Sequence, residues 1–177
     1  MKNIVVLGAT GSIGQSAVKV ALDIPQKMRI VGLSAHRNLA KFEELAARFP
    51  GAALCVTGEK APSNLGPCRK VLRGEEGLIE LATLPEADMV LIAIVGTGGL
   101  RPALAAIEAG KDLAIASKEI LVMAGETVME AARRKGVRIL PVDSEHNAIF
   151  QCLEGRDLAH VRRLILTASG GPFRKLP

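Results

Sequence analysis

The chain alternates between short apolar runs and longer stretches with helical spacing. The apolar runs predict strands at 4–7, 29–33, 53–56, 89–95, 113–116 and 137–140. Between them apolar residues recur every three or four positions, which predicts helices at 13–22, 39–49, 75–82, 100–109 and 120–134. Strands and helices that alternate at these lengths indicate an α/β fold, a doubly wound, Rossmann-like sheet whose strands are mostly parallel.

Two stretches depart from this pattern. Residues 59–74 are rich in Pro and Gly and give no clear prediction. After residue 150 the pattern predicts the continuation of a helix over 150–158 and one strand over 160–168. A single strand cannot bury itself. We therefore expect residues 1–150 to form the Rossmann-like domain, and residues 151–177 to begin a truncated α+β domain whose remainder lies outside this sequence.

The amino-acid composition indicates which residue types form the hydrophobic core and in which cellular compartment the protein is expected. Hydrophobic residues make up 49% of the chain but aromatic residues only 2%, so the core is expected to be aliphatic. The longest unbroken apolar run, 89–95, is too short to span a bilayer. The N-terminus enters a strand-like stretch without the apolar region of a signal peptide. These features predict a cytoplasmic protein that does not associate with a membrane.

The net charge and the cysteine content indicate which ligands, disulfides and metal sites to expect. The net charge is +5, but the basic residues are scattered, and four Phe are the only aromatic residues available to stack on bases. This balance fits anionic small molecules better than nucleic acid. The three cysteines form no Cys-x-x-Cys pair, so the sequence predicts neither a disulfide framework nor a zinc site.

A glycine-rich segment follows the first predicted strand and opens the first predicted helix. It reads Gly8-Ala9-Thr10-Gly11-Ser12-Ile13-Gly14. Glycines allow the backbone to approach a pyrophosphate, and the helix N-terminus offers N–H groups to it. The spacing is Gly-x-x-Gly-x-x-Gly rather than the commoner Gly-x-Gly-x-x-Gly, so a plain strand–helix turn is the alternative. The position in a strand–turn–helix unit favours cofactor binding.

The end of the second predicted strand indicates which dinucleotide would bind. A site for NAD usually places a carboxylate here, on the ribose 2′-hydroxyl. This chain instead has His36, Arg37 and Asn38. Two basic side chains and an amide suit the 2′-phosphate of NADP, although an exposed basic loop would have the same composition.

Two carboxylates, Asp143 and Glu145, follow the apolar run at 137–140. On extended backbone, residues two apart point to the same side. Two such oxygen ligands could hold Mg²⁺ or Mn²⁺. Taken alone, the stretch is explained better by an N-cap Asp followed by an acidic first helical turn.

Two further segments follow predicted strands. Ser117-Lys118-Glu119 comes after the strand at 113–116, where Lys118 could stabilise developing negative charge near a metal. A helix cap and a surface cation are the alternative. Ser169 opens a Ser-Gly-Gly turn that could form a backbone nest for a phosphate, although taken alone the segment is explained better by an ordinary loop.

Taken together, the segments GATGSIG, ASKE, LVMAGE, LPVDSEHNAIFQCL and ILTASGGPF occur in the order of one known family. The chain resembles the 1-deoxy-D-xylulose 5-phosphate reductoisomerase family over essentially its whole length. The resemblance implies an enzyme of isoprenoid precursor synthesis that rearranges 1-deoxy-D-xylulose 5-phosphate. It then reduces the product with NADPH to 2-C-methyl-D-erythritol 4-phosphate, with Mg²⁺ or Mn²⁺ as Lewis acid. Residues 1–150 would bind NADPH, and residues 151–177 would begin the catalytic domain.

The resemblance also assigns roles to individual residues. Metal ligands would be Asp143 and Glu145, and these two with Lys118 would be the catalytic residues. Substrate contacts would come from Lys118, Ser144, Glu145 and Ser169. Cofactor contacts would come from Thr10, Gly11, Ser12 and Ile13 at the pyrophosphate, from His36, Arg37 and Asn38 at the 2′-phosphate, and from Ser117 and Glu119 near the nicotinamide.

The chain departs from the family in two ways. Ser117 stands where the family usually has Asn. Family members are also considerably longer, so a third carboxylate ligand and further phosphate contacts are expected beyond residue 177. This chain alone is therefore expected to be inactive. Members of the family commonly form homodimers, and the full-length protein is expected to do the same. A non-catalytic NADP-binding module and another NADP-dependent dehydrogenase remain as alternatives, and the carboxylate pair argues against the dehydrogenase.

Overall fold

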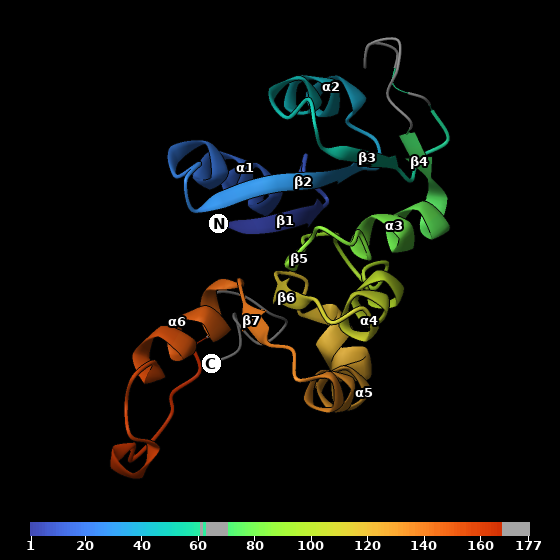
Figure 1. The fold of residues 1–177 in the computed structure, drawn as a ribbon. Helices are drawn as coiled ribbons and strands as arrows, with labels where there is room; N and C mark the ends of the chain where they lie inside the picture. Colours follow the sequence, from blue (N-terminus) through green and yellow to red (C-terminus); the bar gives the residue numbers. More distant parts are fainter. Residues whose placement is uncertain (61, 63–70, 168–177) are drawn as a thin grey trace, which may run out of the picture.

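Seven parallel strands form a single sheet in the computed structural model, which describes residues 1–60, 62 and 71–167 (Figure 1). The strands are β1 (Lys2–Leu7), β2 (Met28–Ala35), β3 (Ala53–Val56), β4 (Val71–Arg73), β5 (Met89–Ile92), β6 (Asp112–Ile115) and β7 (Ile139–Pro141). Their order across the sheet is β4-β3-β2-β1-β5-β6-β7, and every pairing is parallel. The predicted doubly wound sheet is confirmed.

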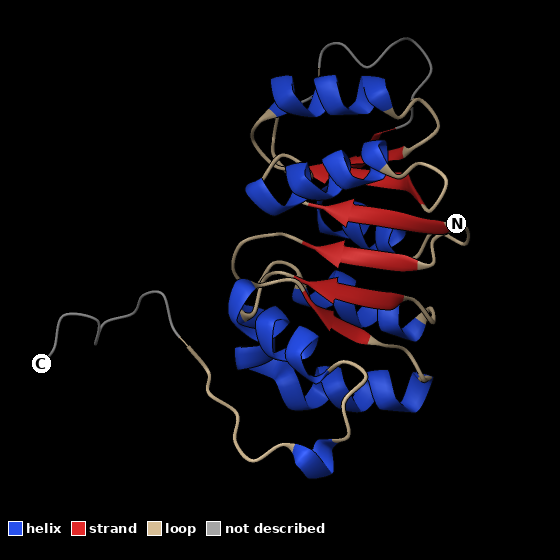
Figure 2. Ribbon diagram, turned by 90° about the vertical axis from the view of Figure 1, so that its left-hand side faces the viewer, coloured by secondary structure: helices blue, strands red, loops and turns tan. Residues whose placement is uncertain are grey.

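Helices cover both faces of the sheet (Figure 2). They are α1 (Ser12–Asp23), α2 (Leu39–Arg48), α3 (Gly74–Ala82), α4 (Leu100–Glu108), α5 (Glu119–Lys135) and α6 (Ser144–Leu153), with a short 3₁₀ helix at Leu158–His160. Helices α3, α4 and α5 supply one hydrophobic core, and α1 and α2 supply the other. No described helix is both long enough and apolar enough to cross a membrane.

Alternation along the strands explains why both faces are buried. In β1, Val5 and Leu7 belong to the core under α3–α5, whereas Ile4 and Val6 belong to the core under α1 and α2. Successive strand residues point to opposite faces, so a continuous apolar run fills two cores at once. The four side chains of this run are at most 8% exposed, which accounts for the all-aliphatic composition of residues 4–7.

The strand order reverses between β1 and β5. Strands added after β1 extend the sheet in one direction, and those after β5 extend it in the other. At this switch point the turns after the two strands come very close, because a Cβ added at Gly8 would lie 2.6 Å from the carbonyl oxygen of Ala93. Ligands of such sheets bind at the carboxyl ends of strands beside the switch point.

The structure corrects the sequence-based elements at three places. The strand predicted over 160–168 is wrong for its described part, because residues 161–167 have no regular secondary structure and pair with no described strand; Ala168 lies outside the described residues. The helix predicted through residue 158 ends at Leu153. The run 89–95 is a strand only to Ile92, since the chain then turns toward Gly96, whose φ is +77°.

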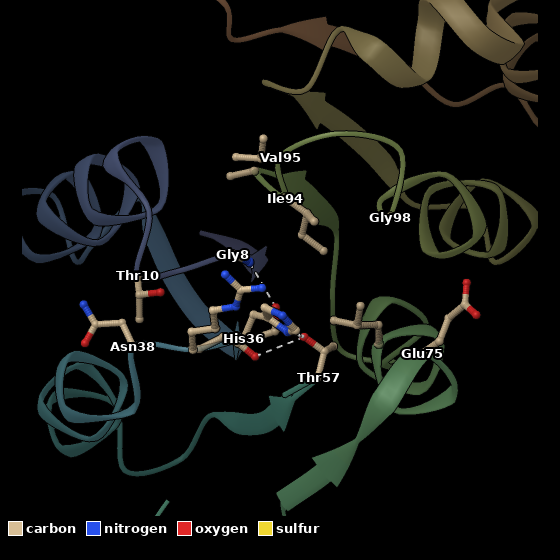
Figure 3. A pocket seen from close by; sticks show the side chains of 14 residues that line it. Gly8, Thr10, His36, Asn38, Thr57, Glu75, Ile94, Val95 and Gly98 are labelled. Carbon is tan, nitrogen blue, oxygen red and sulfur yellow. Dashed lines mark hydrogen bonds between the residues drawn. The ribbon is translucent and has the colours of Figure 1, made fainter. Parts of the chain in front are cut away.

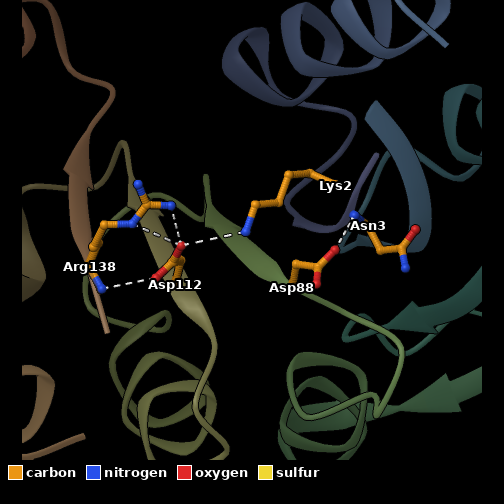
Figure 4. A network of polar contacts seen from close by, with 5 residues as sticks. All are labelled: Lys2, Asn3, Asp88, Asp112 and Arg138. Atoms are coloured by element: carbon orange, nitrogen blue, oxygen red, sulfur yellow. Dashed lines mark hydrogen bonds and ion pairs between the residues drawn. The ribbon is translucent and has the colours of Figure 1, made fainter. Parts of the chain in front are cut away.

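A polar network lies at the amino-terminal ends of the strands, opposite the turns at the switch point (Figure 4). The carboxylate of Asp112, at the start of β6, accepts hydrogen bonds from the backbone N–H of Arg138 at 3.0 Å and from its guanidinium at 2.6 Å. Lys2 Nζ lies 4.0 Å away. Burial opposes ionisation of Asp112, but the bonds and charges of Arg138 and Lys2 outweigh it, so the pKa of this carboxyl is lowered.

We expect Asp112→Asn to lower the free energy of unfolding by about 1 kcal/mol at neutral pH, because the partners of Asp112 are charged but partly exposed. A lowered carboxyl pKa stabilises the fold above the unfolded-state pKa of about 4, and this contribution disappears as pH falls through the folded value. Urea unfolding at several pH values measures it. The difference between wild type and variant should shrink below pH 4, and a difference that does not change with pH would contradict the assignment.

Candidate functional site

The glycine-rich segment between β1 and α1 forms a tight turn at the switch point. Gly8 has a φ of +89°, and its N–H donates to the Ser34 hydroxyl at 3.0 Å. Gly11 is the N-cap of α1, and its N–H donates to the Gly8 carbonyl at 3.1 Å. Within this described segment no side chain caps α1, and its first turn has no acidic residue. The helix therefore presents an open, positively polarised N-terminus, which fits a pyrophosphate.

A cavity of about 660 Å³ lies beside this turn (Figure 3). Its walls come from the turns after β1, β2, β3 and β5 and from the start of α3. Figure 3 shows Thr10 and Asn38 on one side of it and Ile94 and Val95 on another. The lining combines apolar side chains with a few convergent polar groups, and the volume is typical of a small-molecule pocket.

The basic group predicted to select NADP lies at this cavity. His36, Arg37 and Asn38 directly follow β2, and all three line the cavity. Asn38 is also the N-cap of α2, where its side-chain oxygen accepts the N–H of Lys41 at 3.1 Å. The backbone that presents the two basic side chains is thus fixed by the strand on one side and the helix cap on the other. The end of β2 carries no carboxylate.

The other predicted cofactor residues are divided between two places. Thr10 lines the cavity, whereas Gly11, Ser12 and Ile13 lie at the exposed start of α1 beside it. Ser117 and Glu119 do not line the cavity. Glu119 is exposed in the first turn of α5.

Ser117 connects the cavity to the neighbouring strand end. The side chain is buried, and its hydroxyl donates to the carbonyl of Ile94, a lining residue. Its hydroxyl is therefore directed into the protein. This observation favours an indirect role, in which Ser117 fixes the cavity wall.

Several lining residues were not predicted. Thr57 follows β3, Ile94 and Val95 follow β5, and Leu78 lies in α3. The available signal was positional, since Thr57 and Ile94 come one and two residues after strands that flank the pair β1 and β2. The position of Leu78 at the cavity could not be predicted in this way. The segment 59–74, which precedes α3 in the sequence, gave no prediction, so the place of α3 beside the strand ends was unknown.

A second group of polar side chains lies at the ends of β6 and β7. Asp143 is the N-cap of α6, and its carboxylate accepts the N–H of His146 at 3.0 Å and lies 2.7 Å from the His146 ring. Glu145 is in the first turn of the same helix. Lys118, after β6, places its ammonium 3.4 Å from the Glu145 carboxylate. Because β6 and β7 are neighbours, the three predicted catalytic residues are brought together.

The geometry of the carboxylate pair differs from the sequence argument. Asp143 itself has extended backbone, but the helix begins at Ser144, so the extended alignment of the two side chains does not continue to Glu145, and that prediction was wrong. Instead the two carboxylates project from a helix N-cap and first turn, the arrangement that the local alternative described. Capping and metal binding do not exclude one another, because a carboxylate has lone pairs for both.

The environment keeps Asp143 ionised. Burial opposes its charge most strongly, but the N–H and ring of His146 and the charge of Lys118 outweigh it, so the pKa of Asp143 is lowered. The side chains of Asp143 and Glu145 are only 11% and 17% exposed.

Two charged carboxylates with a lysine beside them suit a hard divalent cation and an anionic oxygen ligand. The set is incomplete within the described part of the chain, where no group of three His, Cys, Asp or Glu side chains could hold a metal. Ser144 is exposed at the start of α6, and Ser169 lies outside the described residues.

Comparison with protein families adds independent evidence. The family model for 1-deoxy-D-xylulose 5-phosphate reductoisomerase matches residues 4–125, and the model for the C-terminal domain of that enzyme matches residues 139–177. Curated reductoisomerases of this name from Symbiobacterium thermophilum and Geobacillus kaustophilus are 50% and 49% identical over 98% of the chain. The chain spans about half the length of these relatives, 47% in both.

Solved structures agree with the sequence comparison. The enzyme of this name from Zymomonas mobilis, in complex with NADPH, superimposes with a TM-score of 0.86 at 39% identity, over 99% of this chain and 47% of that one. A reductoisomerase in complex with NADPH, fosmidomycin and magnesium gives 0.78 at 41% identity, over 86% of this chain and 39% of that one. A biliverdin reductase from Synechocystis, at 22% identity and a TM-score of 0.57, shares the fold alone.

Proposed function

Because the chain belongs to the 1-deoxy-D-xylulose 5-phosphate reductoisomerase family, we propose that its protein converts 1-deoxy-D-xylulose 5-phosphate to 2-C-methyl-D-erythritol 4-phosphate. The proposed reaction rearranges the carbon skeleton and then reduces the resulting aldehyde with NADPH, and it requires Mg²⁺ or Mn²⁺. The observation that carries the proposal is the position of Lys118, Asp143 and Glu145. They lie at the ends of β6 and β7, in the sheet whose switch point holds the dinucleotide cavity.

The cofactor half of the proposal depends on the turn after β1 and the group after β2. The open N-terminus of α1, with Thr10, Gly11, Ser12 and Ile13, would accept the pyrophosphate. Arg37 and the imidazole of His36 lie at the end of β2, where the 2′-phosphate of NADP binds in this fold. A charge-assisted contact of this kind distinguishes NADPH from NADH.

In the substrate half, Asp143 and Glu145 would hold the metal, which supplies a Lewis acid that polarises substrate oxygens. Lys118 places a positive charge 3.4 Å from Glu145, where it would stabilise negative charge that develops on a metal-bound substrate during rearrangement. His146 and the N-cap geometry hold Asp143 in its charged form. Ser144 and Ser169 are proposed to contact the substrate, and Glu119 the nicotinamide side, whereas Ser117 would act indirectly by fixing the cavity wall at Ile94.

The proposal covers more than this chain contains. We propose that residues 1–150 bind NADPH, that residues 151–177 begin the catalytic domain, and that the remaining metal and phosphate contacts come from the part of the relatives that this chain does not span. The full-length protein is proposed to be a cytoplasmic homodimer. Sedimentation analysis would test the dimer, and a monomer at working concentration would contradict it.

The metal requirement tests the proposed reaction. In the full-length protein, oxidation of NADPH at 340 nm should need both the sugar phosphate and a divalent cation. Exhaustive chelation should reduce the rate to background, and added Mg²⁺ or Mn²⁺ should restore it. Turnover that survives complete removal of divalent metal would reject the proposal and favour a metal-independent dehydrogenase.

A further inference from the structure

The cavity contains one polar side chain whose contact connects two turns. Thr57, the first residue after β3, places its hydroxyl 2.9 Å from Nδ1 of His36, in the turn after β2 (Figure 3). The same hydroxyl lies 3.4 Å from the Ala35 carbonyl, to which it can donate. The backbone N–H of Thr57 also donates to that carbonyl, at 3.0 Å. Thr57 therefore continues the β2–β3 ladder by one residue and then binds the imidazole.

The next residue brings the two turns still closer. A Cβ added at Gly58 would lie 2.1 Å from the carbonyl oxygen of His36 and 3.2 Å from its carbonyl carbon. Both are backbone atoms, which cannot move aside as a flexible side chain can. Any larger residue at position 58 must push the turn after β3 away from the turn after β2. Thr57 and Gly58 thus support His36 through a hydroxyl contact and a close backbone contact.

The hydroxyl contact fixes which ring nitrogen is available to a ligand. With Nδ1 bound to Thr57, the imidazole has only Nε2 for a further partner. If Thr57 donates to Nδ1, the neutral ring carries its proton on Nε2. If Thr57 accepts from Nδ1 and donates to Ala35, the proton lies on Nδ1, and Nε2 carries one as well only when the ring is protonated, the form that a bound phosphate favours. Nε2 can therefore donate to a phosphate oxygen in the first arrangement, and in the second once the ring is protonated.

From this geometry we propose that Thr57 is a positioning residue for NADPH binding. Thr57 orients His36 so that Nε2 of the imidazole donates to the 2′-phosphate. Gly58 is required for the turn after β3 to approach the turn after β2 closely enough for this contact. The proposal rests on the NADPH specificity proposed above and adds to it the origin of that specificity. Thr57 acts through His36, so its effect should depend on the 2′-phosphate, the one group that NADPH has and NADH lacks.

The test is the affinity of the full chain for NADPH and for NADH, measured by fluorescence titration, in wild type and three variants. Thr57→Val keeps the shape but removes the hydroxyl, and it should weaken NADPH binding about fivefold to tenfold while changing NADH binding less than about twofold. Thr57→Ser restores the hydroxyl and should recover most of the loss. Gly58→Ala should weaken NADPH binding by at least as much as Thr57→Val.

Thr83→Val is the matched control. Thr83 is also half-buried and donates its hydroxyl to a backbone carbonyl, that of Ile79 at 2.9 Å, but it does not line the cavity. This variant should bind both nucleotides as wild type does. Unchanged NADPH affinity in Thr57→Val, or equal losses for NADPH and NADH, would overturn the inference while leaving the proposed function intact. A wild-type chain without preference for NADPH would overturn the proposed cofactor, and this inference with it.

Discussion

Asp143→Asn is expected to reduce kcat of the full-length protein by about a thousandfold and to leave NADPH affinity within about twofold of wild type. The substitution keeps the size of the side chain and keeps an oxygen that can accept the N–H of His146, now 3.0 Å from Asp143. Asn and Asp are equally good N-cap residues, so α6 should still begin at Ser144. What is lost is the negative charge that would hold the metal.

Asp157→Asn is the matched control for this experiment. Asp157 also caps a helix, the 3₁₀ helix Leu158–His160, and its carboxylate accepts the N–H of Ala159 at 2.9 Å. It lies outside the group formed by Lys118, Asp143 and Glu145, so this variant should retain nearly full activity. If Asp143→Asn kept more than about a tenth of wild-type kcat, Asp143 would be a helix cap only, and the proposed metal site would be wrong.

Gly14→Ala is expected to weaken NADPH binding by about tenfold to a hundredfold and to lower the thermal midpoint. A Cβ at this buried position would lie 2.3 Å from the carbonyl oxygen of Gly8 and 2.6 Å from the Cα of Ala9. Both atoms belong to the backbone of the turn that is proposed to bind the pyrophosphate. The turn must therefore shift away from α1, which separates the N–H groups that would contact the phosphates.

The control for this variant is Gly125→Ala, which makes the same change within α5. A Cβ there would lie 3.9 Å from Leu121 Cβ, an ordinary contact, and the position follows a kink in α5 at Ala124, away from the turn after β1. Gly125→Ala should leave NADPH affinity unchanged and should not lower the thermal midpoint. Equal NADPH affinity in wild type and Gly14→Ala would show that the turn after β1 does not bind the cofactor.

Local patterns in the sequence were enough to predict the strand, turn and helix that form one side of the cavity. The run at 4–7 fills both cores, and the glycines after it allow the tight turn. Strand, turn and helix can therefore all be predicted from residues 4–22. The same holds for His36 and Arg37, whose significance follows from their position after β2. Such features depend on neighbours along the chain, which a sequence shows directly.

Features that depend on distant neighbours could not be predicted. β4 is three residues long and is a strand because it pairs with β3. The Pro- and Gly-rich sequence before it does not predict this pairing. The run 160–168 has strand-like composition, yet its described residues have no partner strand. Likewise, the contact between Thr57 and His36 joins residues 21 positions apart, through turns whose approach depends on Gly58.

The identity of the product formed by the full-length protein separates the proposed reaction from every other NADPH-dependent reduction on this fold. Incubation of ¹³C-labelled 1-deoxy-D-xylulose 5-phosphate with NADPH and Mg²⁺ should yield 2-C-methyl-D-erythritol 4-phosphate by NMR. One NADPH should be consumed for each rearranged molecule. A reduced product that keeps the unbranched carbon skeleton, or no product with metal and cofactor present, would contradict the proposed function.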